Sequence, residues 1–373
     1  MDGPNPALEF TSLTRLTLGV GKRSRMIERY LDDLENRIDP EVENRLEAEW
    51  VAFTDGAFSG DIFSPKRAVQ SRPQVEWPSV SVNRAQADFD AMLLQQYGAC
   101  SAQLASGGAG GLMAVRANYG TGIIPTLFGA ELFVMDEPLN TLQTTRPLGG
   151  ESMQALVERG MPEMESGLGA TVFAAGKRFA QIAAQYPKIG RYVHIYHPDM
   201  QGPMDLCELL WGSEIFMDLI DKPELVHRVL RLLTDTYVQF MRLWDGVVGT
   251  NGRNWAAHWS MMHAGKIMIR TDSGMNLSPD MYEEFIRPYD QRLLNELGGG
   301  AVHFCGRGSH YIASTCSMDR MYAINLSQPH LNEMETIYRN TVDKRIKLLG
   351  FSREHAEKTL AAGRNLHGCV HCG

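Results

Sequence analysis

Two residues with metal-ligating side chains, His303 and Cys305, stand two positions apart at the end of a short apolar run. Successive side chains of a β-strand point to opposite faces, so residues two apart would present an imidazole and a thiol side by side. Zinc binds both groups well. One further soft ligand would complete a catalytic zinc site, which has three protein ligands and an open fourth position.

The segment 367–372, His-Gly-Cys-Val-His-Cys, offers candidates for that further ligand. It contains a second His-x-Cys pattern, which overlaps the Cys-x-x-Cys pattern of Cys369 and Cys372. A single His-x-Cys match is a weak signal in a chain with 11 His and 6 Cys, whereas its repetition favours a metal site. The alternative interpretation is buried, reduced cysteines without a metal.

Composition excludes several classes of function. The 373 residues are 44% hydrophobic and 21% charged, which suits a soluble globular protein with a sizeable core. A net charge of −8 without a basic run argues against a nucleic-acid partner. No apolar run approaches the ~18 residues needed to span a membrane. The few cysteines do not form a disulfide framework, so we expect reduced thiols and a cytoplasmic protein.

The first 110 residues have mainly helical patterns. Between residues 24 and 50, apolar residues recur at three- and four-residue spacing among many charges, which predicts amphipathic surface helices. A connector containing Pro65, Pro73 and Pro78 follows, and then a further helical pattern. We therefore expect residues 1–110 to form a helical extension that packs on the next domain and is a candidate contact for a homodimer.

After residue 111, short apolar runs alternate with longer helical patterns. The runs predicted to be strands are 112–117, 191–196, 255–259, 267–271, 301–305, 321–326, 345–349 and 365–370. Clear helices are predicted over 223–244 and 278–297, the latter with Ser278 as N-cap and Pro279 at its first position. Alternating strands and helices indicate an α/β fold with a parallel sheet, and about eight such units over residues 111–373 predict a (β/α)8 (TIM) barrel. An open doubly wound sheet is the alternative.

In a barrel, active-site groups lie at the C-terminal ends of the strands, where this chain has its unusual polar residues. We expect Tyr119, His197, Gln201 and His258 to contact substrate, although each also has a purely structural interpretation. Asp272 is the predicted catalytic residue, because it could orient a metal-ligating histidine or accept a proton. The alternative for Asp272 is a cap on backbone amides at the start of a helix.

Several segments together resemble a known family. Asp272, the segment 277–289 (Leu-Ser-Pro-Asp-Met-Tyr-Glu-Glu-Phe-Ile-Arg-Pro-Tyr), His303-x-Cys305-Gly306 and Cys372-Gly373 are similar to the uroporphyrinogen decarboxylase superfamily. Within it, the match is to the zinc- and corrinoid-dependent methyltransferases. The segment 199–206 (Asp-Met-Gln-Gly-Pro-Met-Asp-Leu) is also similar, so the resemblance covers about residues 190 to 373.

The resemblance implies a (β/α)8 barrel with His303, Cys305 and Cys372 as zinc ligands, and Cys369 is the alternative third ligand. It implies a methyl group that moves between a methylated corrinoid on a partner protein and a small-molecule acceptor, a thiol or similar. Zinc would deprotonate that thiol and so make it a good nucleophile.

Two other functions stay open. True uroporphyrinogen decarboxylases carry an Arg-rich N-terminal signature that grips substrate carboxylates, and this chain has no counterpart to it. A metal-independent lyase of the same superfamily, acting on a different carboxylated substrate through Asp272 and the strand-end histidines, is the main alternative. The other alternative is a non-enzymatic protein that binds a corrinoid or tetrapyrrole. Its zinc would be structural, and Cys369 would be the fourth ligand that completes the coordination sphere.

Overall fold

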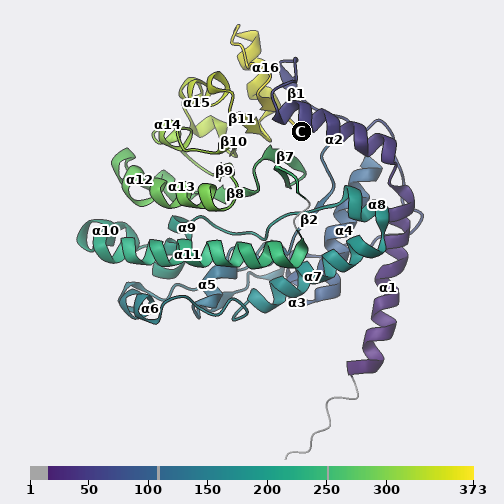
Figure 1. The fold of residues 1–373 in the computed structure, drawn as a ribbon, viewed down its shortest axis with the longest axis horizontal. Coiled ribbons are helices and arrows are strands. Elements are labelled where there is room, and N and C mark those ends of the chain that lie inside the picture. Colours follow the sequence, from purple (N-terminus) through teal and green to yellow (C-terminus); the bar gives the residue numbers. More distant parts are fainter. Residues whose placement is uncertain (1–15, 107–109, 250–251) are drawn as a thin grey trace, which may run out of the picture.

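The computed structural model of the protein describes residues 16–106, 110–249 and 252–373, and it combines α-helices with parallel strands (Figure 1). The helices are α1 (Leu16–Arg37), α2 (Pro40–Thr54), α3 (Val82–Ala87), α4 (Phe89–Ser106), α5 (Ile123–Leu127), α6 (Met153–Arg159), α7 (Gly169–Gln185), α8 (Pro187–Tyr192), α9 (Pro203–Trp211), α10 (Ile215–Asp221), α11 (Pro223–Val248), α12 (Pro279–Phe285), α13 (Arg287–Glu296), α14 (Ile312–Thr315), α15 (Met334–Asn340) and α16 (Arg353–Ala361). The strands are β1 (Ile62–Phe63), β2 (Ala114–Val115), β3 (Leu132–Phe133), β4 (Thr144–Thr145), β5 (His194–Ile195), β6 (Trp255–His258), β7 (Met261–Ala264), β8 (Ile267–Arg270), β9 (Gly300–Phe304), β10 (Met321–Leu326), β11 (Lys347–Leu349) and β12 (Val370–His371).

The N-terminal helices form where the apolar spacing predicts them. Asp39 lies between α1 and α2, and its side chain accepts a hydrogen bond from the backbone N–H of Glu41, which caps α2. The carboxylate of Glu35 accepts the backbone N–H groups of Lys188 and Ile189 at the start of α8. These contacts join α1 to α8, which lies about 150 residues further along the chain.

Six parallel strands form one sheet, in the order β1-β12-β11-β10-β9-β8. Four of them, β8 to β11, overlap strands predicted from the apolar runs. The strand predicted over 365–370 shares only Val370 with β12, because the chain makes a turn at residues 367 and 368. The sixth, β1, comes from the region expected to be a helical extension, and it pairs with β12 through Ile62 opposite Val370. Its apolar run is too short to be recognised in the sequence. The division of the chain at residue 110 stays a prediction, but the sheet takes a strand from before that point.

The strands β2 and β5 pair in parallel with each other, apart from the six-stranded sheet. Hydrogen bonds connect this pair to both edges of the sheet. The N–H of Gly110, before β2, donates to the carbonyl of Pro65, just after β1, at 3.0 Å. On the other side, the N–H of Gly202 donates to the carbonyl of Arg270 at the end of β8, at 2.8 Å. Strand pairing therefore establishes an α/β fold with a parallel sheet, and closure into a barrel stays a prediction.

A hairpin covers one face of the sheet. The predicted strand 255–259 is β6, which pairs antiparallel with β7 through a turn in which Trp259 and Ser260 both have positive φ, as tight hairpins require. Residues of the hairpin share a hydrophobic cluster with one face of β8 to β11, whereas the opposite face packs against the helices. Two residues on the hairpin-facing side are Ala301 and Ala323, and their small size leaves room for it. Sheet interiors of barrels are usually filled by larger branched side chains.

Three buried histidines hold the hairpin in place. His263 Nδ1 lies 2.9 Å from the carbonyl of Ala264 and donates to it, so its Nε2 accepts from Nδ1–H of His258 at 2.7 Å. His197 Nδ1 donates to the carbonyl of Pro198, and its Nε2 accepts the N–H of Met268 in β8. Burial lowers the pKa of His197 to about 3 and that of His263 to about 4, which keeps both rings neutral.

Helices form at the two positions where the sequence predicts them most clearly, but their bounds differ from the predicted ones. The predicted helix over 223–244 is α11, which continues to Val248. Ser278 caps α12 as expected, because its hydroxyl accepts the N–H of Met281. The single helix predicted over 278–297 is instead two, α12 and α13, which meet at Ile286. Pro288 has no N–H to continue the helical ladder and is tolerated only in a first turn, which accounts for the break.

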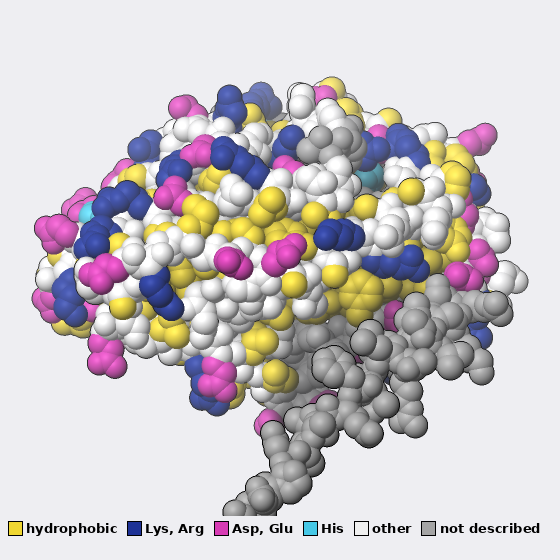
Figure 2. All heavy atoms as spheres, turned by 60° about the horizontal axis from the view of Figure 1, so that its bottom comes forward, with side chains coloured by type: hydrophobic (Ala, Val, Ile, Leu, Met, Phe, Trp, Pro, Cys, Tyr) yellow, Lys and Arg dark blue, Asp and Glu magenta, His cyan; other side chains and the backbone are white. Residues whose placement is uncertain are grey.

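None of the helices in the described ranges is long and apolar enough to cross a membrane. On the face shown in Figure 2, basic and acidic side chains are intermixed rather than segregated. This distribution matches a sequence in which 36 basic and 44 acidic residues are interspersed.

Candidate metal centre

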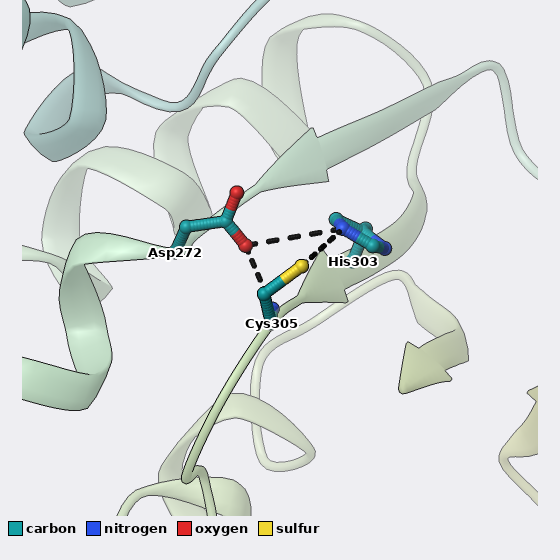
Figure 3. Close-up of side chains that lie close together, drawn as sticks. All are labelled: Asp272, His303 and Cys305. Atoms are coloured by element: carbon teal, nitrogen blue, oxygen red, sulfur yellow. Dashed lines mark hydrogen bonds and ion pairs between the residues drawn. The ribbon is translucent and has the colours of Figure 1, made fainter. Parts of the chain in front are cut away.

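Three metal-ligating side chains meet at the C-terminal ends of β8 and β9 (Figure 3). Asp272 follows β8, His303 lies within β9 and Cys305 directly follows β9. Arg270 and His303 are opposite each other in the parallel pairing, so the two strand ends lie side by side. The two-residue period of β9 brings His303 and Cys305 to the same side, as the sequence predicts.

The donor atoms of the three residues all lie within 4.8 Å of one another. The thiol sulfur of Cys305 is 3.5 Å from Nε2 of His303, and Nε2 is 3.8 Å from Oδ1 of Asp272. The same Oδ1 accepts the backbone N–H of Cys305 at 2.7 Å. Asp272 is itself held by Asp205, whose carboxylate accepts the backbone N–H groups of residues 272 and 273.

Asn325 in β10 determines the orientation of the His303 ring. Its side-chain nitrogen donates to the carbonyl of Leu349 at 2.7 Å, so its oxygen is the atom that faces Nδ1 of His303, at 2.6 Å. An amide oxygen only accepts, so Nδ1 carries the proton and Nε2 has a free lone pair. That lone pair is directed towards Cys305 and Asp272. The sequence analysis considered Asp272 for this orienting role, but Asn325 performs it at Nδ1.

The spacing of these atoms fits a zinc ion. With Zn–N near 2.0–2.1 Å, Zn–S near 2.3 Å and tetrahedral angles, a bound imidazole nitrogen and thiolate sulfur would be about 3.6 Å apart. The observed distance is 3.5 Å. The distance from Nε2 of His303 to Asp272 is a few tenths of an ångström longer than the ~3.4 Å expected for a nitrogen and an oxygen ligand. The donor set of imidazole, thiol and carboxylate is also one that zinc accepts.

Without a metal, both soft ligands are in their neutral forms. Burial lowers the pKa of His303, and the negative charge of Asp272 opposes this effect. Burial also raises the pKa of the Cys305 thiol, and the Asp272 carboxylate raises it further. A divalent cation would have to displace the thiol proton, so its affinity is expected to fall as the pH is lowered.

Removing the amide of Asn325 is expected to weaken metal binding. Asn325→Ala leaves Nδ1–H of His303 without its acceptor, and loss of such a partner typically costs 10- to 100-fold in metal affinity. Asn325→Asp should retain most of the affinity, because a carboxylate still accepts from Nδ1–H. The measurement is zinc affinity by competition with a chromophoric chelator, with exposed Asn295→Ala as the matched control. Equal affinity of the alanine variant and the wild type would contradict this role.

The cysteines near the C-terminus lie apart from this group. Cys372 is buried, and its backbone N–H donates to the carbonyl of Phe63 in β1. Burial raises the pKa of its thiol to about 11, and the charged groups that act on it are Arg353 and Glu357 of α16. The Cys369 sulfur lies 3.6 Å from Nζ of Lys347. The structure thus brings Asp272 to His303 and Cys305, and the ligand role of Cys372 stays a prediction.

The four residues predicted to contact substrate differ in their burial and in their hydrogen bonds. Tyr119 is buried in the main hydrophobic cluster, and burial raises the pKa of its hydroxyl to about 12. Both ring nitrogens of His197 bind backbone groups. His258 is buried beside the rings of Tyr196 and His197, and its Nε2 has no hydrogen-bond partner among the described residues. Gln201 lines a cavity of about 450 Å³ that Asp272 also lines. A role in substrate binding stays a prediction for all four.

Two arginines near the centre, Arg270, which is buried, and Arg116, which is partly buried, were not anticipated. Arg116 and Arg270 both form ion pairs with Asp199, at 3.1 and 2.6 Å. Burial opposes ionisation of Asp199, but the two guanidinium groups hold its pKa below the usual range. Arg270 also lies over the ring of Trp259, which in turn packs against His303. A charged residue near the end of an otherwise apolar run is the signal that would have revealed both arginines.

Comparisons with known proteins show a similarity of fold. No family model matches the sequence, and no curated protein matches it. The structure is similar to that of a methyltransferase from Methanosarcina mazei, with a TM-score of 0.58 over 88% of this chain and 93% of that chain. The two sequences are 16% identical, so the similarity shows a shared fold. Residues 111–373 are 263 of the 373 residues, or about 71%, so a match over 88% also includes part of residues 1–110.

Proposed function

We propose that the protein is a zinc-dependent methyltransferase, which moves a methyl group from a methylated corrinoid to a thiol or similar acceptor. The observation that carries the proposal is the convergence of His303 Nε2 and Cys305 Sγ at 3.5 Å, a spacing that fits zinc. The M. mazei methyltransferase shares the fold, which supports the reaction class. We infer that a partner protein carries the corrinoid and that the chain is a member of the uroporphyrinogen decarboxylase superfamily.

A closed (β/α)8 barrel is part of this proposal. Its support is the hydrogen bond on each side of the β2–β5 pair, at Gly110 and at Gly202. Strand pairing there would join this pair to the six-stranded sheet and so give a ring of eight strands. In such a barrel the ends of β8 and β9 open at the face where active sites lie. His303, Cys305 and Asp272 would then be at the mouth, where a large corrinoid can approach the small-molecule acceptor.

In the proposed site, His303, Cys305 and Asp272 hold the zinc. Bound zinc would take the acceptor thiol at an open position and lower its pKa, so that a thiolate is available at neutral pH. Asn325 holds His303 with its lone pair towards the metal. The second oxygen of Asp272 points away from His303 and Cys305 and is free to accept the proton of the incoming thiol (Figure 3).

The transfer balances without a further reactant. The acceptor sulfur forms a bond to the methyl carbon as the cobalt–carbon bond breaks, and the electron pair of that bond stays on cobalt. The thiol proton leaves before or during attack. The protein's contribution is to position the two substrates and to remove that proton.

The experiment is metal analysis joined to an activity assay. We expect about one zinc per chain and methylation of a simple thiol by free methylcobalamin without oxygen, followed through the absorbance of the corrinoid. A strong chelator should remove zinc and activity together, and added zinc should restore both. A folded, metal-free protein that still transfers methyl groups would contradict the proposal.

One observation favours the alternative of a metal-independent lyase. Arg116 and Arg270 are balanced by the single carboxylate of Asp199, which leaves one positive charge in excess beside the site. Such a charge suits a substrate carboxylate. A lyase would be insensitive to the chelator and would release carbon dioxide from its substrate, so the same chelator experiment separates the two functions.

A further inference from the structure

A cavity of about 450 Å³ is lined in part by Asp272, one of the three residues of the proposed metal site. Its volume lies within the range of small-molecule sites. Gln201, Asp205 and Glu208 come from the loop after β5 and from α9, and Asp272 and Asn276 from the segment after β8. Its other polar lining residues are Thr145 of β4, Thr121, Ser213 and Ser273. A substrate whose reacting atom lies at His303 and Cys305 can therefore extend into this cavity.

Two buried polar side chains of the cavity lack partners. Gln201 is only 7% exposed, and its side-chain amide has no hydrogen bond to any described residue. Thr145 is 6% exposed, its methyl group packs against Gly122, and its hydroxyl has no partner within the described part of the chain. Buried polar groups are nearly always hydrogen-bonded. The Thr145 hydroxyl is fully enclosed, so the Gln201 amide is the one of the two that a ligand in the cavity can reach.

The charges of the cavity define the kind of ligand. Asp205 and Glu208 contribute two carboxyl groups beside Asp272, which the proposed function assigns to the zinc, and no Lys, Arg or His is among the described residues that line it. Glu208 accepts a hydrogen bond from the hydroxyl of Ser273 at 2.6 Å, which orients its carboxylate. An anionic group would be repelled here, whereas a cation would be attracted.

The hydrogen-bonding groups of the cavity restrict further the kind of cation that it can bind. Carboxylates only accept, and the Gln201 amide has an acceptor oxygen beside its N–H donors, so the lining offers several acceptors. A protonated amine offers up to three N–H donors to such a lining. A quaternary ammonium group offers none and is usually bound by aromatic rings, yet no aromatic side chain is among the described lining residues.

We propose that this cavity binds a protonated amino group of the small-molecule substrate. The methyl acceptor would then be an aminothiol, with its thiol as the group that is methylated. This inference rests on the proposed function for the position of the reacting atom. The thiol end would reach His303 and Cys305, and the ammonium end would lie between Glu208 and Gln201. The chain would thereby discriminate among thiols by the charge at their far end.

Three thiols of equal length test the proposal: cysteamine, 2-mercaptoethanol and mercaptoacetate, which are cationic, neutral and anionic at that end. With methylcobalamin as donor, kcat/KM should be at least about tenfold higher for cysteamine than for 2-mercaptoethanol, and lowest for mercaptoacetate. Glu208→Gln should abolish most of the preference, because the amide still accepts from Ser273 but carries no charge. Glu224→Gln makes the same charge change at an exposed position of α11 and should keep the preference.

A binding measurement separates this proposal from the proposed function. Ethanolamine and ethylene glycol have no thiol, so their binding, followed by ligand-observed NMR, does not depend on methyl transfer. Ethanolamine should bind the wild type more tightly than ethylene glycol and should lose this advantage in Glu208→Gln and Gln201→Leu. If it does so while no thiol is methylated, the cavity assignment stands and the proposed function fails. Methylation of all three thiols with equal efficiency, without preferential binding of ethanolamine, would overturn the assignment.

Discussion

Cys305→Ser is expected to remove zinc and methyl transfer together. A hydroxyl at this position is a much poorer zinc ligand than a thiolate, and the remaining His303 and Asp272 would not retain the ion at micromolar zinc. Because the zinc activates the acceptor thiol, we expect the rate of transfer to fall by about a thousandfold or more. His303→Ala should have the same effect. The measurements are zinc content after gel filtration and the initial rate with methylcobalamin.

The matched control is Cys316→Ser, the same change at a buried cysteine after α14. It should retain zinc and activity, although some stability is lost when a hydroxyl replaces a thiol in an apolar environment. Circular dichroism of all three variants establishes whether they fold. Retention of zinc by a folded Cys305→Ser protein would show that the ion is bound elsewhere or that the site is not a metal centre.

Asp272→Asn and Cys372→Ser are expected to separate the two candidates for the third ligand. The sequence resemblance favours Cys372, whereas the structure places the Asp272 carboxylate 3.8 Å from Nε2 of His303. We therefore expect Asp272→Asn to reduce zinc affinity by about 100-fold, since a neutral amide is a weak zinc ligand. Cys372→Ser, whose thiol lies near α16, should bind zinc almost as the wild type does.

The same titration of zinc against a competing chelator serves for both variants, and Cys369→Ser is the control that should retain zinc in either case. The reverse outcome, with zinc lost in Cys372→Ser and kept in Asp272→Asn, would restore the sequence-based assignment. It would also require the chain after β12 to turn its last two residues towards the mouth when the metal binds.

Local sequence patterns were sufficient to predict many elements of the fold. The apolar spacing of α11 and the cap at Ser278 act within one or two helical turns, so the sequence alone predicts them. The same holds for His303 and Cys305, because the two-residue period of a strand places both on one face whatever surrounds it. The alternation of apolar runs and helical patterns also predicted the parallel sheet.

Contacts between segments that are distant in the sequence could not be predicted from local patterns. The partner of His303 at Nδ1 is Asn325, 22 residues away, and it meets His303 only because β9 and β10 pair in one particular register. The third member of the group depends on β8 lying next to β9. Strand order and register arise from packing of the whole sheet, and no local spacing encodes them.

The sequence by itself therefore determined the α/β class of the fold and the placement of His303 and Cys305 on one side of β9, since both follow from periodicities within single elements. Only the tertiary structure decided that β6 and β7 form a hairpin over one face of the six-stranded sheet. It also decided which polar side chains surround the cavity beside Asp272, because Thr145, Gln201 and Asn276 come from three separate segments. These features depend on how faces of distant elements pack together, and burial of those faces is a property of the folded chain as a whole.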